Sequence, residues 1–173
     1  MKRRLIAGTI NRYYPEPGWV NVHIDVSDRG IWDSQLNHAV KPEFVGSIAE
    51  MPMFEAEEFA EVRCHHVLEH LHPDWANVAM REAWRVLKPG GVYDVEVPDA
   101  DRVARAWCAG EVELWEMAQW MLGEQLPNHE PGDSHRGLFT EASLRERLSS
   151  SGFEPGEALP TGLAVRFRAE KVT

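Results

Sequence analysis

The sequence predicts an α/β fold built on a mostly parallel sheet, and two stretches carry this prediction. Residues 59–100 read in order as strand, polar loop, helix, glycine turn and strand. That order is one right-handed βαβ unit, the repeating unit of parallel sheets. Residues 163–169 carry an apolar side chain at every second position, which predicts a half-buried strand, the antiparallel one that ends the sheet.

The N-terminal part of the chain predicts three short strands with abbreviated connections. Residues 4–7 form the first expected strand, residues 20–28 the second strand with its polar exit, and residues 43–45 the third. About ten residues separate the first two strands and include prolines, so this connection is too short and too broken for a crossover helix. Residues 30–40 are expected to form a short helix. The N-terminal half of the fold is therefore abbreviated.

The central helix is predicted from apolar residues that recur at helical intervals between positions 76 and 87. Pro73 suits its first turn. At the other end, Pro89 and the two glycines after it reverse the chain into the next strand. That strand, residues 92–97, is stopped by Pro98.

Beyond the central unit, the chain predicts three more helices within a single domain that spans residues 1–173. Residues 101–108 and 112–122 have helical spacing, and Thr140 is a good N-cap for a third helix. Residues 127–139 form a loop broken by proline and glycine. A chain of 173 residues is long enough for one domain with a core and short for two.

The composition favours a small-molecule, sugar or protein partner over a nucleic acid. The formal net charge is −10 and the pI about 5.2, whereas binding through phosphates needs a clustered basic surface. Cys64 and Cys108 give no disulfide framework, which indicates a reducing compartment. The first apolar run is broken at Asn11 and Arg12, so neither a signal peptide nor a membrane span is expected and we expect a cytoplasmic protein.

The central stretch also resembles a known family. HVLEHL, REAWRVLKPGG and VEVPDA, between residues 66 and 100, are similar to the small S-adenosylmethionine-dependent methyltransferases of the type-11 kind. The sequence SHRGLFTEASLRERLSSSGF, which begins at residue 134, resembles the closing segment of the same family. The resemblance implies a class I, Rossmann-like α/β fold with S-adenosylmethionine as the cofactor and methyl transfer as the reaction.

The resemblance places the cofactor at the carboxyl ends of the first, second and fourth strands. A glycine-containing loop lets the backbone approach the cofactor closely, and a carboxylate after the second strand accepts hydrogen bonds from both ribose hydroxyls. The segment after the third strand faces the adenine. The residues that match these positions are Ala7, Gly8 and Thr9, Asp25 and Val26, Ser47 and Ile48, and Cys64 and His65.

Three histidines are the candidates for catalysis. Methyl transfer is an in-line displacement, so the protein must hold the acceptor atom behind the methyl group and remove its proton where needed. Histidine has a suitable pKa for such a base. His65 and His66 follow the fourth strand, and His135 lies on a loop that could fold over the site. The Asn/Asp-Pro-Pro-Tyr motif of amino-group methyltransferases is absent, which favours oxygen or another acceptor over DNA bases. The acidic charge and the family resemblance point to a small molecule or a glycan as the acceptor, with O-methylation as the expected reaction.

One alternative is a protein that keeps the fold without the activity. Thr9, Ser47 and Ala60 stand where the family usually has a glycine or an acidic residue. Because fold does not imply function, a binding or regulatory protein with a degenerate catalytic site fits these departures as well.

A second alternative comes from residues 66–70, which spell H-x-x-E-H, an inverted zinc-peptidase signature. That signature needs one continuous helix and a third ligand downstream. Pro73 and the preceding strand argue against such a helix, so no metal ligands are assigned. Glu69 and His70 are expected instead to orient the loop and to cap backbone groups.

In the fifth expected strand, apolar and charged residues alternate, whereas a parallel strand that is covered on both faces lacks this alternation. Tyr93, Val95 and Val97 are apolar, whereas Asp94 and Glu96 between them are charged. A strand covered on both faces is expected to be apolar on both. We therefore hypothesise that missing helices leave one sheet face open to solvent or to a partner chain, which would favour a homodimer.

Overall fold

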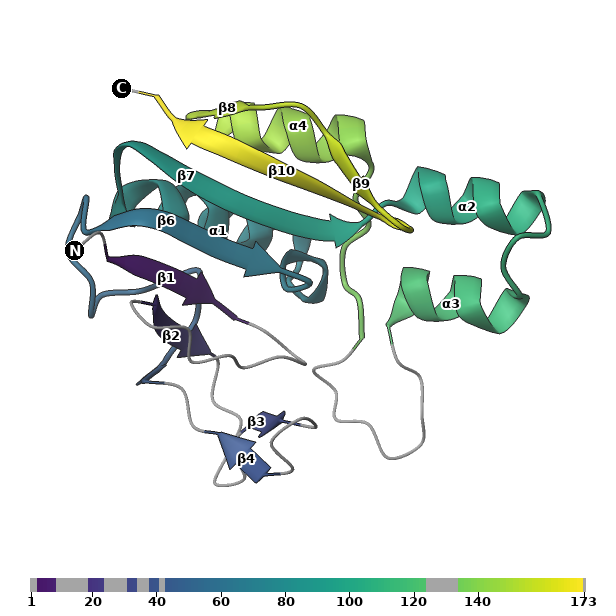
Figure 1. Cartoon of the computed structure of the whole chain (residues 1–173), viewed down its shortest axis with the longest axis horizontal. Helices are drawn as coiled ribbons and strands as arrows, with labels where there is room; N and C mark the ends of the chain where they lie inside the picture. Colours follow the sequence, from purple (N-terminus) through teal and green to yellow (C-terminus); the bar gives the residue numbers. More distant parts are fainter. Residues whose placement is uncertain are drawn as a thin grey trace.

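The computed structural model describes residues 3–8, 19–23, 31–33, 38–40, 43–123 and 134–172. These residues form an eight-stranded sheet in the order β5-β2-β1-β6-β7-β10-β8, with β9 paired to β10 (Figure 1). The strands are β1 (Arg4–Ala7), β2 (Trp19–His23), β5 (Phe44–Val45), β6 (Phe59–His65), β7 (Leu87–Pro98), β8 (Phe153–Pro155), β9 (Leu159–Thr161) and β10 (Ala164–Lys171). The first five pair in parallel, and β10 runs antiparallel to β7. The predicted mostly parallel sheet with an antiparallel terminal strand is confirmed.

Helices accompany the sheet on one face and at one end. They are α1 (Pro73–Val86), α2 (Ala100–Cys108), α3 (Leu114–Leu122) and α4 (Glu141–Ser150), with a short 3₁₀ helix η2 (Leu68–His70). Figure 1 shows α1 and α4 behind the sheet, whereas α2 and α3 extend beyond the end of β7. The predicted helices after the central unit are confirmed, although α3 begins two residues later than expected.

The predicted βαβ unit is the centre of the hydrophobic core. Strand β6 is followed by α1 and then by β7, which pairs in parallel with β6. Helix α1 buries one apolar stripe because its small and medium side chains recur at helical spacing. The fully or almost fully buried core residues on α1, α4, β7 and β10 include Ala76, Ala79, Met80, Ala83, Leu144, Leu148, Tyr93, Val95, Val97, Val165 and Phe167.

The prediction of a short helix at residues 30–40 is wrong. Strands β3 (Ile31–Asp33) and β4 (His38–Val40) pair antiparallel there and form a separate two-stranded sheet, with Ile31 opposite Val40 and Trp32 opposite Ala39. Isoleucine, valine and tryptophan favour extended backbone, and this local preference prevails over a sparse helical spacing. The expected loop between the first two strands lies outside the described residues.

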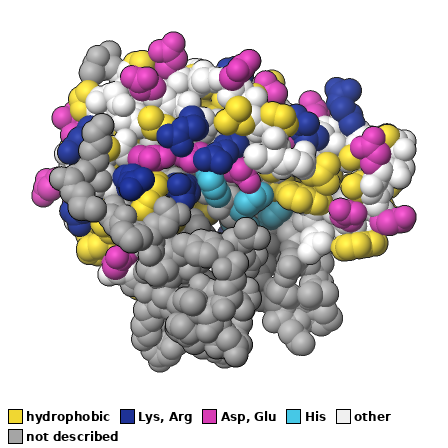
Figure 2. All heavy atoms as spheres, viewed as in Figure 1, with side chains coloured by type: hydrophobic (Ala, Val, Ile, Leu, Met, Phe, Trp, Pro, Cys, Tyr) yellow, Lys and Arg dark blue, Asp and Glu magenta, His cyan; other side chains and the backbone are white. Residues whose placement is uncertain are grey.

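The second face of the sheet, opposite α1, carries charged side chains and no described helix (Figures 1 and 2). In neighbouring strands, Arg63 lies opposite Asp94, which in turn lies opposite Arg168. Asp94 is nevertheless fully buried, and the Glu96 side chain is only 15% exposed. The hypothesis of a face without covering helices therefore holds for the described residues, but side chains of its own strands bury Asp94.

The capping box at Thr140 gives a first testable prediction. The Thr140 Oγ1 accepts from the Ser143 N–H at 3.2 Å, and the Ser143 Oγ accepts from the Thr140 N–H at 2.9 Å. Thr140→Ala removes one side of this exchange and should lower the free energy of unfolding by about 1 kcal/mol. Urea unfolding measures the change. Thr140→Ser keeps the hydroxyl and should retain most of the stability, so an equal loss in both variants would contradict the capping role.

Within the described residues, none of the helices combines the length and the apolar character that crossing a membrane requires.

Candidate active site

Gly8 ends β1 in a conformation that favours glycine. Its φ is +71°, in the left-handed region, and its N–H donates to the Val22 carbonyl at 2.8 Å. A Cβ at this position would lie 3.0 Å from Cγ1 of Val67, a residue of the segment that follows β6. The absence of a side chain therefore lets the backbone at Gly8 lie directly against that segment.

Two described positions follow the third strand of the parallel sheet, β5. Ser47 is exposed, and its hydroxyl accepts from the Ala49 N–H at 3.2 Å while its own proton is free to donate. Ile48 is 4% exposed and belongs to the core. Ala7, at the end of β1, is buried as well. The remaining predicted cofactor residues before β6, Thr9, Asp25 and Val26, lie outside the described residues.

The two residues that end β6 point to opposite faces of the sheet. Cys64 is fully buried beside Tyr93, and burial raises the pKa of its thiol to about 12. The thiol is therefore neutral and enclosed, so only the backbone of Cys64 remains for a cofactor. His65 faces the charged side of the sheet, where its Nε2 lies 3.1 Å from Oδ1 of Asp94. This contact holds the His65 ring on the charged face of the sheet.

Asp94 is the centre of the charged face. Arg166 donates to both carboxylate oxygens, from Nε at 2.7 Å and from Nη2 at 2.6 Å, and Arg168 Nη1 donates at 3.2 Å. The Arg63 Nε lies 3.7 Å away. Burial opposes ionisation of Asp94, but His65 and Arg166 outweigh it and hold the pKa of Asp94 well below its usual range. The carboxylate is charged at any physiological pH.

His66 stands at the carboxyl end of the sheet in a strained backbone conformation. Its φ is +53°, which is uncommon for a residue with a side chain and occurs often at functional sites. Its Nε2 lies 2.9 Å from Oε1 of Glu96, and its Nδ1 lies 3.4 Å from Oε1 of Glu69. Burial lowers the pKa of His66, but the two carboxylates outweigh it and raise the pKa to about 9. His66 is therefore a cation between two carboxylates at neutral pH.

Glu69, His70 and His135 come together next to His66. The Glu69 carbonyl accepts from the Arg136 and Gly137 N–H groups at 2.7 and 3.0 Å, which draws the segment of His135 onto η2. The rings of His70 and His135 meet edge to face with centroids 4.8 Å apart. Together, His66, Glu69, His70 and His135 form what we term the histidine–carboxylate cluster. Figure 2 shows histidine side chains gathered beside the charged sheet face.

The prediction for Glu69 and His70 is only partly right. The backbone of Glu69 does hold the following loop, but its carboxylate caps no backbone group, since neither oxygen accepts a hydrogen bond from a described residue. Sequence reasoning placed His66 and His135 in the site and gave Glu69 and His70 a local role. The H-x-x-E-H spacing was the signal that marked them, although the zinc-peptidase interpretation was rejected because Pro73 and the preceding strand argue against one continuous helix. In the structure these residues span a strand end and the η2 turn, so the continuous helix of a zinc peptidase is absent here.

Comparison with known proteins identifies the family. A family model described as a methyltransferase domain matches residues 7–94, about half of the chain. The chain belongs to this methyltransferase family. The methyltransferase is of the class I type and uses S-adenosylmethionine as its cofactor, as the sequence resemblance implied. No curated protein sequence matches it significantly.

Solved structures share the fold of the methyltransferase. A Burkholderia thailandensis 1,6-didemethyltoxoflavin-N1-methyltransferase, with 1,6-didemethyltoxoflavin and S-adenosylhomocysteine bound, is 22% identical, with a TM-score of 0.61 over 99% of this chain and 72% of the other. A Methanosarcina mazei protein described as a SAM-dependent methyltransferase is 17% identical, with a TM-score of 0.63 over 99% and 92%. At these identities the likeness concerns the fold, and it agrees with the observed Rossmann-like sheet.

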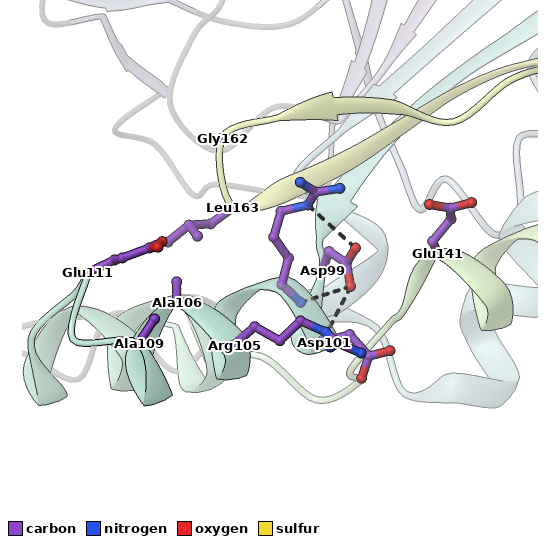
Figure 3. A pocket seen from close by; sticks show the side chains of 10 residues that line it. Asp99, Asp101, Arg105, Ala106, Ala109, Glu111, Glu141, Gly162 and Leu163 are labelled. Carbon is purple, nitrogen blue, oxygen red and sulfur yellow. Dashed lines mark hydrogen bonds and ion pairs between the residues drawn. The ribbon is translucent and has the colours of Figure 1, made fainter.

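A hollow of about 540 Å³ lies beside α2 of the methyltransferase (Figure 3). Its lining residues are Asp99, Asp101, Arg102, Arg105, Ala106, Ala109, Glu111, Glu141, Gly162 and Leu163. Asp99 is committed to the fold, because its Oδ1 accepts from the Asp101 and Arg102 N–H groups as the N-cap of α2. None of the described residues that are expected to bind cofactor or to act in catalysis lines this hollow.

Proposed function

We propose that the protein transfers the methyl group of S-adenosylmethionine to a hydroxyl oxygen of a small molecule or a glycan. The contact between Gly8 and Val67 carries this proposal. Val67 lies between His66 and Leu68, so the turn expected to approach the cofactor lies against the segment that holds the histidine–carboxylate cluster. A cofactor at Gly8 and an acceptor at the cluster would thus be neighbours, which is the arrangement that an in-line transfer needs.

The described residues fit the cofactor at both ends of the expected site. Gly8 presents backbone without a side chain, and Ser47 keeps a hydroxyl proton that can be donated to a ring nitrogen of adenine. We assign Ala7 and Thr9 to the same turn as Gly8, Asp25 and Val26 to the ribose, Ile48 to the adenine, and the backbone of Cys64 and His65 to the inner wall. These assignments follow the family match, and the variants described in the Discussion test the first of them.

Among the three candidate histidines, the cluster favours two. When bound, S-adenosylmethionine supplies an electrophilic methyl group and leaves as S-adenosylhomocysteine. The chain must then hold the acceptor hydroxyl and receive its proton. His66 and His135 lie in the cluster, at the carboxyl end of β6, whereas His65 is engaged with Asp94 on the sheet face. We therefore assign the acceptor hydroxyl to the cluster and give His65 no part in the chemistry.

The proposed class of methyl acceptor rests on the net charge of the chain and on the residues at the end of β6. A net charge of −10 disfavours a phosphate-rich acceptor, and Cys64, His65, His66 and Val67 stand where amino-group methyltransferases place their Asn/Asp-Pro-Pro-Tyr motif. The Burkholderia thailandensis protein is named for methyl transfer to N1 of a small molecule, which supports a small-molecule acceptor here and leaves the choice of oxygen to the residues at the end of β6. A carboxylate, or a neutral histidine such as His135, whose pKa burial lowers, can receive a hydroxyl proton, whereas the His66 cation can only donate a hydrogen bond to the acceptor.

Cofactor binding is tested first, by thermal unfolding with S-adenosylmethionine and with S-adenosylhomocysteine. At about 100 times the dissociation constant, binding should add about 2.7 kcal/mol and raise the midpoint by roughly 5–11 °C. Transfer is then followed with methyl-labelled S-adenosylmethionine and a panel of sugars, phenols and amines. Label on a hydroxyl oxygen supports the proposal, and label only on amines contradicts the oxygen acceptor. A cooperative unfolding transition with no shift from either ligand would favour the degenerate binding protein.

A further inference from the structure

The Glu69 side chain is buried with its hydrogen-bonding capacity unmet. The residue is 1% exposed, and neither of its carboxylate oxygens accepts a hydrogen bond from a described residue. The ion pair with His66, whose Nδ1 lies 3.4 Å from Oε1 of Glu69, offsets part of the cost of burying this charge, but the lost hydrogen bonds to water are not replaced. Native structures place a water molecule or an ion at such groups, so the unmet hydrogen-bonding capacity of the carboxylate points to a missing ligand.

Two histidine nitrogens beside Glu69 lack hydrogen bonds as well. The Nδ1 atoms of His70 and His135 are buried and have no hydrogen-bond partner among the described residues. Glu69, His70 and His135 each offer one ligand atom, and these atoms all lie within 4.8 Å of one another. Three potential ligand groups thus lie close together, and each keeps a buried polar atom without a hydrogen bond.

The scaffold holds the three residues in place. Glu69 and His70 share η2, and the N–H groups of Arg136 and Gly137 bind the Glu69 carbonyl. On the other side, the His135 N–H donates to the carbonyl of Leu122, the last residue of α3, at 3.0 Å. His135 is thus tied by backbone hydrogen bonds to both neighbouring elements, and the donors converge without any need for the chain to refold.

We propose that Glu69, His70 and His135 form a binding site for a divalent first-row transition-metal ion such as Mn²⁺, Co²⁺ or Zn²⁺. Two imidazoles and one carboxylate are the donor set that these ions prefer, whereas Mg²⁺ and Ca²⁺ favour oxygen ligands alone. Metal–ligand distances of about 2.0–2.2 Å require the donors to move slightly inward. Three protein ligands leave coordination positions open for water or for an acceptor.

His66 and Glu96 complete the surroundings of this site. The His66 Nδ1 lies 3.4 Å from Oε1 of Glu69, and its Nε2 lies 2.9 Å from Oε1 of Glu96. Carboxylates that orient a histidine in this way accompany many metal sites. His66 therefore holds Glu69 from one side and adjoins the open positions. The role of the ion in holding an acceptor hydroxyl rests on the proposed function, whereas the metal site itself does not.

The experiment uses the purified, chelator-treated full chain without cofactor. Cobalt titration followed by visible absorption, and calorimetry with Mn²⁺ and Zn²⁺, should show one equivalent bound to the wild type. Glu69→Gln and His135→Ala should each weaken this binding at least tenfold. His72→Ala is the matched control, because His72 lies just after η2 with a side chain 63% exposed and outside the three donors, and it should bind the metal like the wild type.

Thermal unfolding of the same proteins guards against misfolded variants. Metal should raise the midpoint of the wild type and of His72→Ala but not that of Glu69→Gln. Without metal, Glu69→Gln should still unfold in one cooperative transition, so that the loss of the metal-induced shift is not a loss of folding. No binding to the wild type, or equal binding to Glu69→Gln and His135→Ala, would overturn the site. Titration with S-adenosylhomocysteine is independent: metal binding without cofactor binding would sink the proposed function and leave this site standing.

Discussion

Gly8→Ala should weaken the binding of S-adenosylhomocysteine at least tenfold, which corresponds to about 1.4 kcal/mol. The new Cβ would lie 3.0 Å from Cγ1 and 3.2 Å from Cγ2 of Val67, and a β-branched side chain has little freedom to move aside. Either the turn after β1 or the segment after β6 must shift, and both are expected to border the cofactor. Isothermal titration calorimetry measures the affinity.

A matched variant separates this effect from backbone strain. Gly110 has a φ of +72°, nearly that of Gly8, and a Cβ there would meet nothing within 4 Å. Gly8→Ala and Gly110→Ala should both lose roughly 1–2 kcal/mol of folding stability, because each places an L side chain in the left-handed region. Only Gly8→Ala should lose cofactor affinity. Equal affinities in the two variants would show that Gly8 serves the fold alone.

The parts of the fold that could be predicted are those whose signals are local. The order of strand, helix and strand around α1 was read correctly because Pro73 and the apolar spacing of the helix act within a few residues of one another, whereas the expected glycine turn is part of β7, which begins at Leu87 and not at Val92. The antiparallel pair of β3 and β4 was missed, because sparse helical spacing concealed the pairing of Ile31 with Val40. The capping box at Thr140 was predictable for the same reason as the helix: its partners are three residues apart.

The geometry of the candidate site, in contrast, depends on contacts that leave no local signal in the sequence. His135 joins Glu69 and His70 only through backbone hydrogen bonds from the segment after α3, a tertiary contact with no local signature. The spacing from His66 to His70 did mark three of the four residues of the cluster, and a strand end followed by a 3₁₀ turn presents them. Sequence reasoning therefore found the chemistry-bearing residues and could not predict their geometry.

The alternation of apolar and charged residues in β7 correctly indicated a sheet face that none of the described helices covers. The burial of a charged side chain on that face was not predicted. An exposed Asp94 was the natural expectation, whereas arginines of β6 and β10 and the ring of His65 enclose it. Long arginine side chains can cover a sheet by laying their methylene groups along it while their charged ends meet a carboxylate. Ion pairs between side chains of β6, β7 and β10 thus cover this face, on which the described residues form no helix.

Asp94→Asn should lower the free energy of unfolding by about 2–3 kcal/mol, and the midpoint by roughly 4–12 °C. The substitution keeps the shape of the side chain and removes its charge, so Arg166 loses a bidentate carboxylate partner. Breaking a fully buried pair costs about 3–5 kcal/mol, and the expected loss is smaller here because solvent reaches the Arg166 side chain, which is 29% exposed. Thermal and urea unfolding at pH 7 measure the change.

Glu141→Gln is the control for a pair of the same chemistry at the surface. Glu141 Oε1 lies 3.5 Å from Arg145 Nη2, with both side chains more than 40% exposed, and its loss should change stability by less than about 0.5 kcal/mol. A loss in Asp94→Asn no larger than in this control would mean that the charged network contributes nothing to folding.

Acid titration of stability distinguishes the charge of Asp94 from its packing. The pKa of Asp94 is lowered in the folded state from its ordinary value of 3.8, so the folded protein holds the charged form more tightly than the unfolded chain does. Its contribution is fully present above the unfolded pKa and is lost as the pH falls through the folded one. The stability difference between the wild type and Asp94→Asn should therefore stay constant between about pH 5 and pH 8 and narrow below about pH 4. A difference that is independent of pH down to acid unfolding would assign the loss to packing, because asparagine and aspartate then differ in something other than charge.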